Sequence, residues 1–217
     1  MEWSLMVNTP LAVRGRAGPR GGAAHSVDEV FGVTAMPSAP TQPRMTQGSF
    51  FVGLFEKGLR LQDGPLADAL RDVGYDLHRP RGEYPITVWN EALRLTWRLL
   101  WPDKSYEQAY RDFGKRFFDG FAQTLVGSVL AIGLPVLGPE RFLKRLPQYM
   151  KVDTYSYRVE SHEQGPRHWL LVFRNDPDAK PDFVAGLIEA SLLRAGTQAT
   201  VEVSFREPTN FDLTVRW

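Results

Sequence analysis

The stretch that decides the fold lies at the end of the sequence, where residues 200–217 read TVEVSFREPTNFDLTVRW. Apolar and polar side chains alternate there in two runs, one over residues 201–206 and one over residues 211–217. A period of two puts successive side chains on opposite faces of a strand. The two runs therefore predict two strands, each with one face turned toward the core.

Two more strands and a helix precede this pair. Residues 154–160 alternate in the same way, and so do residues 168–174. Because the second of these runs has apolar residues on both faces, we predict that it is a central strand. Pro181 then opens a helix that is predicted to run to Ala195, and Gly196 ends it in the position that glycine favours after a helix.

The first half of the domain has the helical period instead. Ser49 is a suitable N-cap, and apolar residues then recur at spacings of 3 and 4 in five predicted helices, over residues 50–59, 65–73, 85–100, 106–132 and 140–146. Helices followed by β-β-α-β-β predict an α+β fold in which an N-terminal helical layer packs on a C-terminal antiparallel sheet.

One long uncharged stretch has the composition of either a buried core helix or a membrane helix. No charged residue occurs from Phe121 to Gly138. The run is at the short end of the roughly 20 apolar residues that a membrane helix needs. We therefore interpret residues 122–132 as the inner half of the long helix, buried on all sides in the middle of the fold, and predict a break from Gly133 to Gly138. We expect no membrane span.

Composition divides the chain at residue 45. Residues 10–45 hold five Pro and five Gly, so we predict that residues 1–45 form a disordered tail. A true start of translation at Met45 and an interaction tail are the alternatives. Residues 46–217 are predicted to form a single α+β domain.

Charge and cysteine content exclude several classes of function. Residues 46–217 hold 22 basic and 22 acidic residues, so no overall field attracts nucleic acid. The chain has no cysteine, which excludes disulfides, thiolate catalysis and cysteine-based zinc sites. A cysteine-free chain without a visible secretory signal leads us to expect a cytoplasmic location.

No motif for catalysis or for a metal stands out. His162 and His168 lie near Glu160 and Glu163, but their spacing is not that of a rigid ligand pair, and we predict no metal. Neither a nucleophile elbow nor a phosphate-binding glycine loop is present. We therefore expect no catalytic residues and no cofactor, while an enzyme whose site assembles from scattered residues stays open.

Aromatic residues are the unusual feature of the helical half. Their spacing is typical of core packing, but glycines along the same helix leave room for an apolar ligand between the helices and the sheet. The candidate pocket residues are Trp89, Trp97, Tyr110, Phe113, Phe117 and Phe121. We expect Phe117 to fill the core, and Phe121, next to Gly120, to lie where space opens.

Several short stretches resemble a known family in their order along the chain. They are residues 50–55 (FFVGLF), 84–85 (YP) followed by Trp89, 110–114 (YRDFG), 138–143 (GPERFL) with 145–147 (RLP), and 183–190 (FVAGLIEA) ahead of Trp217. In these stretches the chain resembles the myxobacterial paralogous family known as domain of unknown function 2378. The resemblance covers roughly residues 49–217 and implies no activity, because the family has none assigned.

The order of elements is also similar to a ligand-binding fold shared by haem–nitric-oxide-binding domains and trafficking-particle subunits. The haem-binding version depends on a Tyr-x-Ser-x-Arg motif and a helical His; residues 155–158 read YSYR, and the long helices contain no His. We therefore expect no haem. The resemblance implies a sensory or regulatory module, not an enzyme, that binds an apolar small molecule, a protein partner or a second copy of itself. A structural dimerisation domain is the other alternative.

Overall fold

The computed structural model describes residues 43–150 and 157–217. Its elements are β1 (Met45–Gln47), α1 (Gly48–Phe51), the π-helix η2 (Val52–Gly58), α2 (Pro65–Asp72), β2 (Glu83–Pro85), α3 (Ile86–Leu100), α4 (Tyr106–Phe121), α5 (Leu125–Leu137), α6 (Pro139–Tyr149), β3 (Arg158–Gly165), β4 (His168–Arg174), α7 (Pro181–Arg194), β5 (Thr200–Arg206) and β6 (Phe211–Arg216). The predicted mixture of helices and antiparallel sheet is confirmed.

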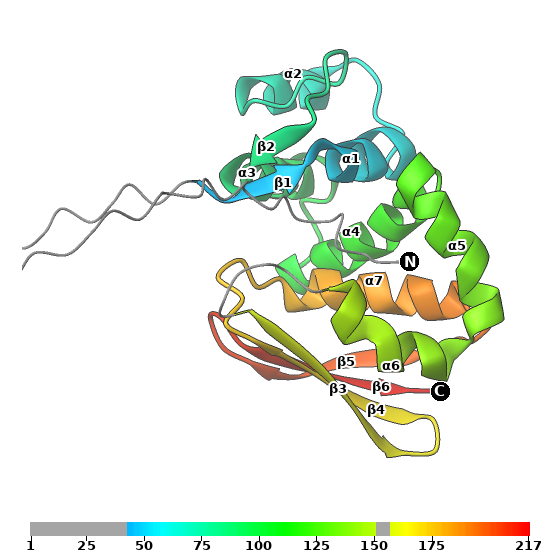
Figure 1. Cartoon of the computed structure of the whole chain (residues 1–217). Coiled ribbons are helices and arrows are strands. Elements are labelled where there is room, and N and C mark those ends of the chain that lie inside the picture. Colours follow the sequence, from blue (N-terminus) through cyan, green and yellow to red (C-terminus); the bar gives the residue numbers. More distant parts are fainter. Residues whose placement is uncertain (1–42, 151–156) are drawn as a thin grey trace, which may run out of the picture.

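The larger sheet has the strand order β3-β4-β6-β5, with every neighbouring pair antiparallel. The prediction that the strand over residues 168–174 is central is confirmed. Its inner side chains pair with those of β6, and the rings of Phe173 and Phe211 stack with centroids 4.3 Å apart. Figure 1 shows α6 and α7 on one side of this sheet, so its inward face is covered by helices.

Two glycines allow α4 and α7 to cross in backbone contact. A Cβ at Gly114 would lie 2.0 Å from the carbonyl oxygen of Phe183, and one at Gly186 would lie 1.9 Å from that of Arg111. An ion pair between Arg111 and Glu189, at 2.5 Å, joins the same two helices. The close crossing fixes α4 directly above α7, which in turn lies on the sheet (Figure 1).

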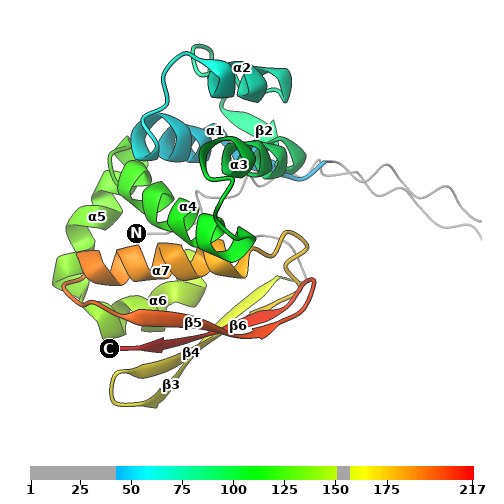
Figure 2. The same ribbon diagram turned by 180° about the vertical axis from the view of Figure 1, so that it is seen from behind.

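The remaining helices lie beyond α4. Both views place α1, α2 and α3 on the side of α4 that faces away from the larger sheet (Figure 1, Figure 2). A two-stranded sheet of β1 and β2 ties this part together. Aromatic rings fill its interior, and Phe51, Tyr75 and Tyr84 are all fully or almost fully buried.

The amino-terminal boundary differs from the prediction. The predicted tail falls largely on residues 1–42, which lie outside the described residues, but Arg44 and Met45 belong to the fold: the carbonyl of Arg44 accepts a hydrogen bond from the Ile86 amide at 2.8 Å, and Met45 starts β1. Ser49 is not an N-cap. It lies inside a helix that already begins at Gly48, because the extended residue Gln47 ends β1 there.

The predicted long helix over residues 106–132 is wrong. The chain turns after α4, and the hydroxyl of Thr124 accepts a hydrogen bond from the Gly127 amide at 3.1 Å, so a new helix begins. That helix, α5, then continues past the predicted break at Gly133 and through Pro135 to Leu137. Proline has no amide to donate to the carbonyl of Ala131, and Arg194 donates to it instead at 3.2 Å.

The expectation that this apolar stretch is buried on all sides is also wrong. Four side chains along one face of α5 are exposed, and they are Leu125, Val129, Ile132 and Val136. Ala131 and Leu134 on the other face are buried. Both faces are apolar, so the sequence carries no polar stripe to mark the outer one. Among the described residues, no helix has the length and hydropathy that crossing a membrane requires.

Candidate functional site

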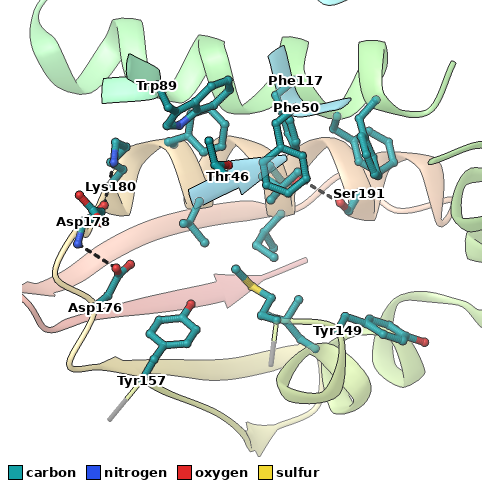
Figure 3. Close-up of a pocket in the computed structure, with 18 of the residues that line it drawn as sticks. Thr46, Phe50, Trp89, Phe117, Tyr149, Tyr157, Asp176, Asp178, Lys180 and Ser191 are labelled. Carbon is teal, nitrogen blue, oxygen red and sulfur yellow. Dashed lines mark hydrogen bonds between the residues drawn. The ribbon is translucent and has the colours of Figure 1, made fainter. Parts of the chain in front are cut away.

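A cavity of about 290 Å³ lies where α3, α4, α6 and α7 meet the loop that follows β4. The residues that line it come from seven regions of the chain, and they are Thr46, Phe50, Ile86, Trp89, Phe117, Phe118, Phe121, Phe142, Leu146, Tyr149, Met150, Tyr157, Asp176, Asp178, Lys180, Phe183, Val184, Leu187, Ile188 and Ser191. Figure 3 shows the aromatic rings along one wall and a small group of polar side chains at one end.

The aromatic wall is built from the helical half of the molecule. Phe117 and Phe121 lie one turn apart on α4 and stack with centroids 5.5 Å apart. Phe50 packs edge-on against Phe117 at 5.3 Å, and Trp89 packs edge-on against Phe183 at 6.2 Å. These contacts hold the rings in fixed positions around the empty space, so the cavity is preformed.

The polar end is built by the short loop between β4 and α7. The carboxylate of Asp176 accepts a hydrogen bond from the Asp178 amide at 3.0 Å, which closes a turn. The carboxylate of Asp178 accepts from Asn90 at 2.9 Å and pairs with Arg44. Lys180 Nζ donates to the carbonyl oxygen of Asp178 at 2.9 Å. The loop is therefore tied both to α3 and to the segment that enters β1.

Burial makes the charged forms of Asp176 and Lys180 unfavourable. It raises the pKa of the Asp176 carboxyl above its ordinary value of 3.8 and lowers the pKa of Lys180 below 10.5. The pKa of the Tyr157 phenol is raised, first by burial and then by the charge of Asp176. Figure 3 places Tyr157 and Asp176 near one another at this end. Groups with shifted pKa values gathered in one cavity are typical of functional sites.

The six candidate pocket residues divide into two groups. Trp89, Phe117 and Phe121 line the cavity. The other three do not. Phe113 is fully buried and packs against Trp101 with ring centroids 4.8 Å apart, while Trp97 and Tyr110 border a shallow groove on the outside of α3 and α4. The aromatic stripe of α4 therefore lines the cavity at Phe117 and Phe121 and packs away from the cavity at Tyr110 and Phe113.

The polar residues of the cavity are not among the candidates predicted from the sequence. Asp176, Asp178 and Lys180 lie in the stretch NDPDAKP, whose composition is that of an ordinary solvated loop. Tyr157 was assigned only to a strand. The one local signal was the position of three charged residues between a central strand and a helix. Nothing in the sequence shows that Arg44 and Asn90 meet this loop.

The two histidines near the first hairpin lie away from the cavity. His162 is in β3, where its ring lies 3.0 Å from the carboxylate of Glu160, and His168 begins β4. Within residues 43–150 and 157–217, no three His, Asp or Glu side chains are grouped so that they could hold a metal ion.

Solved structures with a similar fold include haem proteins. An oxygen-binding H-NOX domain related to soluble guanylate cyclases matches 79% of this chain and 94% of its own, at 14% identity and a TM-score of 0.62. A mutant of an H-NOX protein from K. algicida, in its unliganded Fe(II) form, matches 79% and 96%, at 14% identity and a TM-score of 0.58. At this identity the likeness shows the fold alone.

The cavity does not fit a haem. A cavity of about 150 Å³ holds one benzene ring, so 290 Å³ has room for about two small rings and not for a four-pyrrole macrocycle. No histidine is among the described residues that line it.

Sequence comparison gives the family. No curated protein matches the sequence. The family model described as "Protein of unknown function (DUF2378)" matches residues 44–217, which is the described fold from Arg44 to the final Trp217. The chain therefore belongs to the DUF2378 family.

Proposed function

We propose that the chain is a ligand-binding sensory or regulatory module whose cavity takes up an apolar small molecule. The observation that carries the proposal is the cavity itself, an apolar space with a few convergent polar groups at one end, which is the usual form of a small-molecule site. A purely structural domain would be expected to have a closed core. The cysteine-free composition keeps the cytoplasm as our expected location.

Binding is favoured over catalysis by the state of the candidate nucleophiles. The hydroxyl of Ser191 donates to the carbonyl of Leu187 at 2.8 Å, one turn back along α7. Lys180 Nζ donates to a backbone carbonyl. In the part of the chain that the structure describes, neither is hydrogen-bonded to a side chain that could act as its general base, which nucleophilic catalysis requires.

An enzyme is the second candidate, because Asp176 combines a raised pKa with a place in the cavity. Its role would be that of a general acid or base. Hydrolysis of phenyl acetate is a direct test, since this ester, with about as many heavy atoms as naphthalene, matches the size of the cavity. A rate above buffer that is lost in Asp176→Asn and kept in Glu202→Gln, an exposed site on β5, would favour the enzyme.

The exposed stripe on α5 supports a second copy of this chain as a protein partner. Leu125, Val129, Ile132 and Val136 carry no charge, so two such faces can meet about a twofold axis without like-charge repulsion. Sedimentation velocity of the wild type and of Val136→Lys tests this. A dimer that the substitution dissociates supports the pairing, and a wild-type monomer at high concentration contradicts it.

Naphthalene tests the main proposal, because it has no polar head and about the right size. By proportion with benzene it needs a cavity of about 250 Å³. We expect it to raise the melting temperature of the full chain, since a ligand that binds only the folded state stabilises it. Leu187→Phe fills the cavity and should abolish the rise. Leu193→Phe, on the exposed face of the same helix, should keep it. No rise in the wild type, or an equal rise in both variants, contradicts the proposal.

A further inference from the structure

The charges at the polar end of the cavity sum to zero. Asp176 and Asp178 are the acidic groups, and Lys180 and Arg44 are the basic ones. Arg44 is already paired with Asp178, which leaves Asp176 and Lys180 to face a ligand. The sum stays zero if a proton moves from Lys180 to Asp176, so it does not depend on which of the two forms is present.

The same end also has unused capacity for hydrogen bonds of both kinds. An ammonium group has three donors, and among the described residues Lys180 uses one, toward the carbonyl of Asp178. The Tyr157 phenol keeps its proton and has no hydrogen-bond partner within the described parts of the chain. The Asp176 carboxylate accepts from the Asp178 amide through one oxygen, and its other oxygen can accept more.

We propose that the ligand is a neutral amphiphile of about nine to eleven heavy atoms in all, with an apolar body and a head group that both donates and accepts hydrogen bonds, such as an alcohol or a primary amide. This inference rests on the proposed function of the cavity. The head accepts from Lys180 or Tyr157 and donates to Asp176. The apolar body lies along Phe50 and Phe117 (Figure 3) and along Phe121, which lines the same cavity.

Charged heads are disfavoured because each would leave one uncompensated charge in a half-buried place. A carboxylate beside Lys180 would stand close to Asp176 and Asp178, and an ammonium group beside Asp176 would stand close to Lys180. Burying a charge without a balancing partner is costly. A neutral head adds hydrogen bonds and leaves the balance of charge unchanged.

Four molecules with one tail and different heads test this on the full chain. They are octan-1-ol, octanamide, octanoate and octylammonium, titrated by calorimetry at pH 7. We expect both neutral molecules to bind at least tenfold more tightly than either charged one. Octanoate or octylammonium binding as tightly as octanamide overturns the inference about the head group.

Changing one charge at the polar end should shift the preference from neutral head groups toward a charged one. Asp176→Asn leaves the polar end with one extra positive charge and should improve the binding of octanoate at least tenfold relative to octanamide. Lys180→Met leaves one extra negative charge and should do the same for octylammonium. Glu202→Gln changes the net charge of the protein as Asp176→Asn does, but on the exposed face of β5, and should leave the preference unchanged. Preferences that do not move in the first two variants overturn the inference.

Naphthalene distinguishes a failure of the inference about the head group from a failure of the proposed function of the cavity. If naphthalene raises the melting temperature and none of the four octyl compounds binds, the inference about the head group is wrong and the cavity still takes up apolar molecules. If naphthalene and all four compounds fail, the proposed function is wrong as well.

Discussion

The two ends of α4 carry the same kind of aromatic stripe in different surroundings. At the end of its amino-terminal half, Phe113 is fully buried and packs on Trp101 of the neighbouring turn. At the carboxyl-terminal end, Phe117 and Phe121 face the cavity, across from Met150 and Tyr157. Periodicity alone therefore identifies buried aromatic residues, and what lies opposite each of them decides whether it fills a core or lines a pocket.

The largest effect is expected at the glycine between these two ends. Gly114→Ala would put a methyl group 2.0 Å from the Phe183 carbonyl oxygen and 2.7 Å from the Leu187 amide nitrogen, so α4 and α7 would have to move apart. We expect a loss of about 4 kcal/mol or more in the free energy of unfolding, measured with urea.

Gly133→Ala is the matched control, because a Cβ there meets nothing within 4 Å. Alanine favours a helix over glycine, so this variant should gain about 0.5–1 kcal/mol. Equal stability of the Gly114 variant and the wild type would mean that the two helices do not cross in backbone contact.

The second largest effect on the free energy of unfolding is expected at two phenylalanines of α4, one in the closed core and one at the cavity. Phe113→Ala leaves a new hole in a closed core and should cost about 3–5 kcal/mol. Phe117→Ala enlarges a space that is already there, so it loses fewer contacts and should cost about 1–2 kcal/mol. Only the second variant should also lose the stabilisation by naphthalene. Equal costs at both positions would show that the cavity is filled by neighbouring side chains.

The small cost expected for Phe117→Ala differs from the prediction made from the sequence, which is that Phe117 fills the core. Phe113 and Phe121 flank Phe117 at helical spacing, and that pattern is the same for a core and for a pocket wall. The strands β4, β5 and β6 were predictable because alternation is a local property of the sequence. The strand predicted over residues 154–160 overlaps β3 only from Arg158, and β3 continues to Gly165 through polar residues that the prediction assigned to a loop. The cavity was not, because it depends on Phe50, Trp89 and Phe183, which come together only after α1, α3 and α7 have packed against α4.

A smaller effect is expected at the polar end, and it depends on pH. Burial raises the pKa of Asp176, so the folded state holds this proton more tightly than the unfolded state does. Stability is therefore lost as pH rises from about 3.8 through the folded pKa. Asp176→Asn removes that loss and keeps an oxygen that can accept from the Asp178 amide.

The variant should be more stable than the wild type at pH 7, by less than Phe117→Ala costs, and the difference should disappear below pH 3.8. Lys180 and Arg44 lower the pKa of this carboxyl, but burial raises it by more, so the attraction that the variant loses is smaller than the cost of the buried charge that it avoids. Urea denaturation at pH 3.5 and pH 7 measures the difference. A gain of equal size at both pH values would mean that the charge of Asp176 is not what costs stability.

The smallest effect is expected on α5, the helix that follows the cavity end of α4. The sequence predicted a helix buried on every side, since its hydrophobic residues and glycines give no polar face. The structure instead buries only the side of Ala131 and Leu134, because α5 packs along the edge of the molecule against α6 and α7. An apolar helix can thus be half exposed, and only neighbouring elements decide which half.

Leu125→Gln should therefore change the free energy of unfolding by less than about 0.5 kcal/mol, because 93% of the Leu125 side chain is already exposed and its replacement removes almost no packing. Leu134→Ala on the same helix is the matched contrast. Leu134 is 1% exposed, and its truncation should cost about 2–5 kcal/mol. Urea denaturation at a protein concentration low enough to keep the chain monomeric measures both. If Leu125→Gln costs as much as Leu134→Ala under those conditions, the outer face of α5 is covered within a single chain, and the helix is buried on both sides as its sequence first indicates.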